Sequence, residues 1–113
     1  MSTIALDFDG VLHSYTSPWT TASEISDPPV PGAVEAVKEW LDAGFEVIVT
    51  SARAQNPEGV IAIKKWLKAN GFPALAVHPK HKATLYIDDR GFRFEGHFPS
   101  AEEISGLKTW KLK

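Results

Sequence analysis

The sequence predicts a three-layer α/β fold, in which helices cover both faces of a mainly parallel sheet. Extended apolar runs alternate along the chain with segments whose apolar side chains recur at helical spacing. The resulting order, β-α-β-α-β-β, is typical of such folds. The chain has 113 residues, of which 43% are hydrophobic, so it can bury one core and we predict a single domain over residues 1–113.

The expected strands lie at residues 3–7, 45–50, 74–77 and 84–88. The first is short and apolar, and the second (FEVIVT) is rich in β-branched side chains, which favour strands. Residues 92–96 alternate between aromatic and charged side chains and are expected to form a small hairpin or an edge strand.

Helices are expected between and after these strands. Residues 32–43 carry apolar side chains at helical spacing. The next helix begins at Asn56 and Pro57, a capping residue followed by proline in the first turn. A short last helix begins at Ser100, whose spacing to Glu103 fits a capping box.

Residues 13–31 form a long connection whose prolines prevent a regular helix. Loops of this length in compact domains are often functional. Trp19 lies in this loop, where its ring can either stack on a base of the substrate or pack the loop onto the domain.

Charge and composition exclude several classes of protein. The net charge is −2, so no broad basic surface indicates nucleic acid as a partner, although a local basic patch would still allow it. No run approaches the ~20 apolar residues of a membrane helix, and no signal peptide is expected. Cysteine is absent, which excludes disulfides and thiolate sites and agrees with the cytoplasmic location that we predict.

Acidic residues follow two of the expected strands. Asp7 and Asp9 come after the first strand, and Asp88 and Asp89 end the fourth. The carboxyl ends of parallel strands meet at one edge of the sheet, where crowded carboxylates need a cation to offset their charge. Mg²⁺ prefers oxygen ligands, so the sequence predicts a Mg²⁺ site formed by Asp7 with Asp88 or Asp89.

Such a site suits the hydrolysis of a phosphate monoester. A carboxylate can attack phosphorus and form an aspartyl-phosphate, and Asp7 at the strand end is placed for this role. Asp9 lies beyond the turn, where it can protonate the leaving oxygen and later activate water. Either Thr50 or Ser51, after the second strand, can donate a hydrogen bond to a phosphoryl oxygen.

Basic residues near this edge can neutralise the charge of the phosphate. Either Lys80 or Lys82, just before the fourth strand, can offset charge at the nucleophile. Arg53 either binds substrate or forms a structural ion pair. The histidines do not show the spacing of a zinc site and are expected at the surface or in packing; His13, close to Asp9, can also touch substrate.

The same segments resemble the motifs of the haloacid dehalogenase superfamily. Residues 7–12 (DFDGVL) resemble its first motif, and residues 47–53 (VIVTSAR) resemble the second, a strand that ends in Ser or Thr. Lys80 stands where the lysine of the third motif is expected, and residues 86–90 (YIDDR) resemble the fourth. All the motifs occur in order, within residues 4–90.

The resemblance implies a Rossmann-like phosphohydrolase that uses Mg²⁺. It assigns Asp7 as the nucleophile, and Asp9 as the acid/base and as a metal ligand through its carbonyl. It assigns Asp88 as the side-chain metal ligand, supported by Asp89. The catalytic residues that we expect are therefore Asp7, Asp9, Ser51 and Lys80, with Thr50 and Arg53 binding substrate.

The connection at residues 13–31 is too short for the helical cap domain of larger relatives, so we expect an open, capless site. Residues 51–53 (SAR) resemble the version of the second motif in phosphatase domains of polynucleotide kinases. Nucleotides and polynucleotide ends are therefore the favoured substrates, while sugar phosphates and phosphoproteins remain open.

Two other classes of protein fit the acidic residues. A receiver-like phospho-acceptor also gathers carboxylates, a hydroxyl and a lysine around Mg²⁺, but it places the acceptor after a middle strand. A non-catalytic module that binds metal is the other alternative. The sequence does not indicate an oligomeric state.

Overall fold

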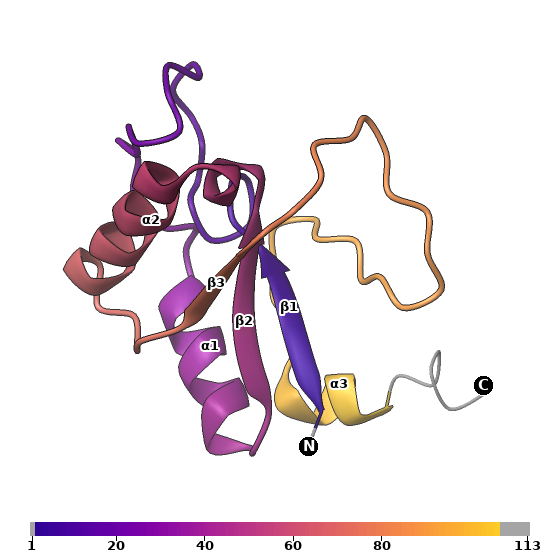
Figure 1. Cartoon of the computed structure of the whole chain (residues 1–113). Coiled ribbons are helices and arrows are strands. Elements are labelled where there is room, and N and C mark those ends of the chain that lie inside the picture. The colour runs from indigo at the N-terminus through magenta and orange to yellow at the C-terminus, as the bar shows by residue number, and fades with distance from the viewer. Residues whose placement is uncertain (1, 107–113) are drawn as a thin grey trace.

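The computed structural model of the chain describes residues 2–106 and has at its centre a parallel sheet (Figure 1). Its strands are β1 (Thr3–Asp7), β2 (Glu46–Ser51) and β3 (Ala76–Pro79), which lie in the order β1-β2-β3. The predicted α/β class and the parallel sheet are confirmed. The third strand begins two residues later than predicted, because the buried side chain of Leu75 belongs to the turn that precedes it.

The register of the strands places polar residues in one row at the carboxyl edge. Asp7 lies opposite Thr50, and Thr50 lies opposite His78 on the other side of β2. Residues that are paired across a sheet point to the same face. The side chains of Asp7 and Thr50 therefore share one face at the end of the sheet.

The helices are α1 (Ala33–Asp42), α2 (Pro57–Ala69) and α3 (Ala101–Gly106), and a 3-10 turn, η1 (Ala52–Gln55), follows β2 directly. The predicted capping box of α3 is present: Glu103 N–H donates to Ser100 Oγ at 3.1 Å, and Ser100 N–H donates to Glu103 Oε1 at 3.0 Å. The side chain of Asn56 makes no capping hydrogen bond, so Pro57 in the first turn is the signal that marks the start of α2.

One hydrophobic core lies between the sheet and the helices. It joins the buried side chains of Leu6 on β1 and Val49 on β2 to those of Val37 on α1 and Ile63 on α2. Alternate residues of the strands, Ala5 and Ala76 among them, point to the opposite face and are exposed. Helices α1 and α2 therefore cover the same face, and the third layer stays a prediction.

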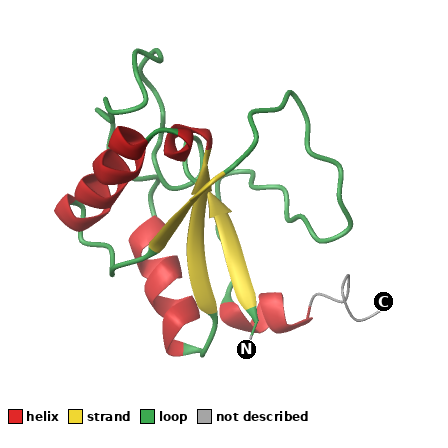
Figure 2. Ribbon diagram, viewed as in Figure 1, coloured by secondary structure: helices red, strands yellow, loops and turns green. Residues whose placement is uncertain are grey.

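Residues 80–100 contain neither a helix nor a strand, and they form a long loop (Figure 2). The predictions of a strand at residues 84–88 and of a hairpin or edge strand at residues 92–96 are therefore wrong for this structure. The apolar run Leu85-Tyr86-Ile87 is short and exposed, and such a run buries too little surface to hold a strand without a neighbour. We call residues 80–97 the 80–97 segment.

No helix within residues 2–106 is long and apolar enough to cross a membrane.

Candidate active site at the carboxyl edge of the sheet

A tight turn after β1 separates the two aspartates of the first motif. The carbonyl of Phe8 accepts hydrogen bonds from the backbone N–H groups of residues 11–13, at 3.0 to 3.2 Å. Gly10 has a φ of 85°, a backbone conformation that residues with a side chain rarely adopt, so the turn depends on a glycine at this position. Phe8 is fully buried, while Asp7 and Asp9 on either side of it remain partly exposed.

Asp7 is the more accessible of the two carboxylates. Its side chain is 41% exposed, and its Oδ1 accepts a hydrogen bond from the N–H of Phe8 at 2.9 Å. Lys80 Nζ lies 3.8 Å from Asp7 Oδ2. Lys80 is the first residue after β3, where its N–H donates to the carbonyl of Ser51 at 3.0 Å. The structure thus brings the predicted lysine of the third motif to the predicted nucleophile, whereas Lys82 is exposed on the 80–97 segment.

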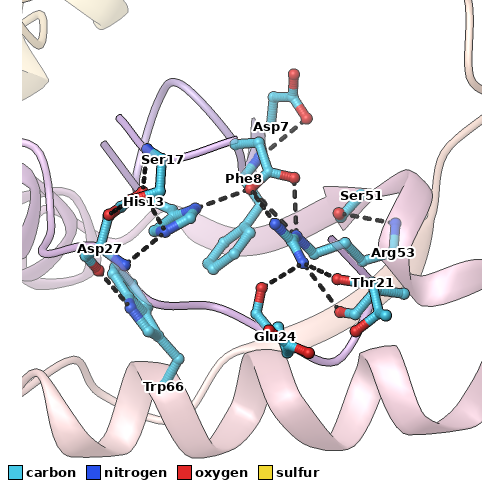
Figure 3. Close-up of polar contacts among 12 residues, drawn as sticks. Asp7, Phe8, His13, Ser17, Thr21, Glu24, Asp27, Ser51, Arg53 and Trp66 are labelled. Atoms are coloured by element: carbon cyan, nitrogen blue, oxygen red, sulfur yellow. Dashed lines mark hydrogen bonds and ion pairs between the residues drawn. The ribbon is translucent and has the colours of Figure 1, made fainter. Parts of the chain in front are cut away.

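Asp9 accepts hydrogen bonds from His13 and Arg53, whose side chains are labelled in Figure 3. Its Oδ1 receives hydrogen bonds from His13 Nδ1 at 2.8 Å and from Arg53 Nε and Nη2, both at 3.1 Å. Its Oδ2 receives one, from Arg53 Nε at 2.9 Å. Oδ2 is therefore the oxygen of Asp9 with fewer donors.

Arg53 joins the sheet to the loop of residues 13–31. Its side chain is buried, and its Nη1 donates to the carbonyls of Thr21, Ala22 and Glu24 at 3.0 to 3.1 Å. The ring of Trp19 covers the guanidinium at 4.3 Å. Of the two roles expected for Arg53, this geometry is that of the structural ion pair, since its hydrogen bonds go to Asp9 and to the loop.

Helix α2 approaches Arg53 closely at its first turn. A Cβ atom on Gly59 would lie 1.9 Å from the carbonyl oxygen of Arg53. A side chain at this position would push α2 away from η1, so glycine is required there.

His13 extends the same network into the core. It is 1% exposed, and its Nε2 accepts a hydrogen bond from the N–H of Asp27 at 3.1 Å, which assigns the ring proton to Nδ1 and makes it the donor to Asp9. Trp66 Nε1 donates to the Asp27 carbonyl at 2.9 Å. The hydroxyl and the N–H of Ser17 donate to the Asp27 carboxylate and hold the pKa of Asp27 below its ordinary value.

The sequence did not single out Asp27 and did not place His13 in a buried network. His13 is a residue of packing rather than of the surface, and its hydrogen bonds go to Asp9 and Asp27. The signal that was available is the proline-rich loop itself, because a long loop on a small domain needs buried anchors for its polar backbone groups.

The two hydroxyl residues of the second motif have different surroundings. Ser51 is 2% exposed, and its Oγ accepts the N–H of Arg53 at 3.1 Å, so it caps the turn η1. Thr50 lies opposite Asp7 and donates its Oγ1 proton to the Leu6 carbonyl at 3.3 Å. Thr50 is therefore the hydroxyl on the face of Asp7, and Ser51 shapes the backbone that carries Arg53.

The structure does not bring the fourth motif to the first. Asp88 and Asp89 lie on the 80–97 segment, and Asp88 Oδ1 accepts the N–H of Arg90 at 2.8 Å. Among residues 2–106, no three acidic or histidine side chains lie close enough together to hold a metal ion. The Mg²⁺ site thus stays a prediction, and it requires Asp88 and Asp89 to approach Asp7.

Comparisons of the chain with protein-family models, with curated proteins and with solved structures find no match. The resemblance to the haloacid dehalogenase superfamily therefore depends on the short motifs and on the placement of Asp7, Asp9 and Lys80.

Proposed function

We propose that this protein is a Mg²⁺-dependent phosphatase that hydrolyses phosphate monoesters through an aspartyl-phosphate on Asp7. The observation that supports it most is the placement of Asp7, an exposed carboxylate at the carboxyl edge of a parallel sheet with Lys80 Nζ at 3.8 Å. Ligands of such sheets bind at this edge. The proposal includes a single three-layer, capless domain that acts in the cytoplasm.

The reaction proceeds in two steps that restore the enzyme. A carboxylate oxygen of Asp7 attacks phosphorus, the ester P–O bond breaks, and the leaving oxygen takes a proton from Asp9, which enters this step as the protonated acid. Water then attacks the phosphorus of the aspartyl-phosphate, and Asp9 takes the proton of that water. Inorganic phosphate leaves and the carboxylate of Asp7 is regenerated.

Lys80 and Thr50 assist at the nucleophile. A phosphate dianion and a carboxylate repel each other, and the ammonium of Lys80 reduces that repulsion. Thr50, on the same face as Asp7, is the side chain better placed than Ser51 to donate a hydrogen bond to a phosphoryl oxygen. Arg53 acts through Asp9, which it holds in place.

Mg²⁺, when bound, neutralises charge on the phosphoryl oxygens. The oxygen donors that would hold it are the side chains of Asp7 and Asp88, supported by Asp89, and the carbonyl of Asp9; hard oxygen ligands of this kind suit Mg²⁺. Binding in this way would require Asp88 to lie beside Asp7.

The test is a panel of phosphate esters assayed with Mg²⁺ and with EDTA, on the wild-type protein and on Asp7→Asn. We expect turnover only with Mg²⁺, and a loss on the order of 10³-fold or more in Asp7→Asn, since a catalytic nucleophile contributes at least that much. Asp42→Asn, at the end of α1, is the matched control and should keep full activity. Full activity in purified Asp7→Asn would overturn the proposal.

The same assay separates the other classes of protein. A receiver-like phospho-acceptor would become phosphorylated on Asp7 without continuous turnover of a generic aryl phosphate. A non-catalytic module would bind Mg²⁺ in a titration and release no phosphate from any ester in the panel.

A further inference from the structure

Two aromatic rings stand beside the two aspartates in the same arrangement. Trp19 covers the guanidinium of Arg53 at 4.3 Å, and Arg53 is bound to Asp9. Tyr86 lies over the ammonium of Lys80 at 4.0 Å, and Lys80 is paired with Asp7. Each ring is thus separated from one carboxylate of the candidate site by a single cationic group.

Both rings contact a cation and are still accessible. Each of them is 48% exposed, although one part of each ring is occupied by its cation. The hydroxyl of Tyr86 donates to the carbonyl of His81, which holds the phenol ring in place. Trp40 and Trp66, by contrast, belong to the core and are buried.

An exposed ring with a fixed orientation is a platform for another flat ring. Stacking of a base on an aromatic side chain is worth about 1–3 kcal/mol and depends little on which base is present, which corresponds to about 5- to 150-fold in affinity. In a nucleotide, one sugar separates the base from the phosphate, and here one cationic group separates each ring from a carboxylate. A phosphate at Asp7 would therefore have Tyr86 on the far side of Lys80, and Trp19 on the far side of the Arg53 that is bound to Asp9.

We propose that Trp19 and Tyr86 bind the base of the substrate, so that the substrates are phosphate monoesters that carry a nucleobase. The inference rests on the proposed function, because it takes Asp7 as the place where the phosphate binds. The rings give the site its specificity for the base, while Arg53 and Lys80 pair with Asp9 and Asp7.

The test compares a phosphate ester with a base and one without it. The ratio of kcat/KM for adenosine 5′-monophosphate to that for ribose 5-phosphate is measured in the wild-type protein, in Trp19→Leu and in Tyr86→Leu. We expect each substitution to lower this ratio by about 5- to 150-fold, because the base-free ester loses no stacking. Trp19→Phe and Tyr86→Phe retain a ring and should restore most of the ratio.

Phe92→Leu is the matched control, since Phe92 is an aromatic of similar exposure (45%) on the 80–97 segment, and it should leave the ratio unchanged. A purely structural role of Trp19 or Tyr86 would lower both rates equally and keep the ratio constant, which overturns the inference. An oligonucleotide with a terminal phosphate is assayed in parallel. A loss of kcat/KM in either arm that exceeds the loss for ribose 5-phosphate supports the inference, and the affected arm identifies whether free nucleotides or polynucleotide ends are the source of the base.

A binding measurement distinguishes failure of the proposed function from failure of the stacking inference. If the wild-type protein turns over no ester, the phosphatase proposal fails. Calorimetric titration with adenosine 5′-monophosphate and ribose 5-phosphate then decides the inference on its own. Tighter binding of the nucleotide that is lost in Trp19→Leu supports base stacking, and equal or absent binding of the two ligands overturns it.

Discussion

The loop of residues 13–31 and the 80–97 segment both lack helices and strands, but the domain holds them in different ways (Figure 2). Buried residues anchor the 13–31 loop: Arg53 donates hydrogen bonds to its backbone carbonyls, and His13, at its start, is buried. The 80–97 segment instead exposes Leu85 and Ile87, at 68% and 89%.

The difference between the two segments lies in their anchoring and not in their apolar content. The 13–31 loop is rich in polar residues and proline, yet its polar backbone groups have buried partners. The 80–97 segment contains a run with high strand propensity, but no neighbouring strand pairs with it. One aspartate pair of the candidate site lies beside the first segment, and the other pair lies on the second.

Removal of the anchor should have the largest effect. Arg53→Met leaves three loop carbonyls without this donor and Asp9 without its ion pair, so we expect a loss of about 3–5 kcal/mol in the free energy of unfolding. Urea denaturation measures it. Arg90→Met, on the 80–97 segment, is the matched control and should change stability by less than about 0.5 kcal/mol. Equal costs for the two variants would contradict the comparison.

A pair of isoleucines tests the same contrast for apolar side chains. Ile63 on α2 is fully buried, whereas Ile87 is exposed. Ile63→Ala should cost about 2–5 kcal/mol, because it removes buried methylene groups and leaves a cavity. Ile87→Ala should stay within about 0.5 kcal/mol of the wild-type protein. Thermal or urea unfolding of both variants measures these losses of stability. A large loss in Ile87→Ala would show that the 80–97 segment is packed on the domain.

Hydrogen exchange shows whether the contrast persists when the metal binds. Without Mg²⁺, the amides of residues 84–88 should exchange much faster than those of β2. With Mg²⁺ and a phosphate analogue, we expect their exchange to slow by about 10- to 100-fold, or about 1.4–2.7 kcal/mol, because Asp88 on this segment would then be held at the metal. Asp88→Asn should abolish that protection. Unchanged exchange in the wild-type protein would contradict Asp88 as a metal ligand.

Much of the fold is readable from local patterns. Strand β1, helix α1 and the capping box at Ser100 follow from periodicity and capping chemistry, which act over a few residues. The segment at residues 84–88 has the same kind of local signal and forms no strand in this structure. Strand propensity describes how a side chain fits a paired surface, and the sequence alone does not reveal whether a partner is present.

The candidate site divides in a similar way. The proximity of Lys80 to Asp7 was predictable, because both residues follow parallel strands of one sheet. The choice between Thr50 and Ser51 was not predictable from the sequence. It depends on which of the two side chains points to the same face of the sheet as Asp7. The network of His13, Asp27 and Arg53 joins residues far apart in the chain, and no spacing in the sequence indicates it.

The smallest expected effect concerns the outer end of that network. The hydrogen bonds of Ser17 lower the pKa of Asp27 below its ordinary value of 3.8. A carboxyl group whose pKa is lower in the folded state stabilises the protein above its unfolded pKa, and this contribution is lost as the pH falls through the folded pKa. Ser17→Ala should therefore raise the pKa of Asp27, as an NMR titration would show, and reduce stability near neutral pH but not in strong acid. Ser26→Ala, in the same loop, should leave the titration unchanged, and an unchanged pKa in Ser17→Ala would show that the loop does not depend on this contact.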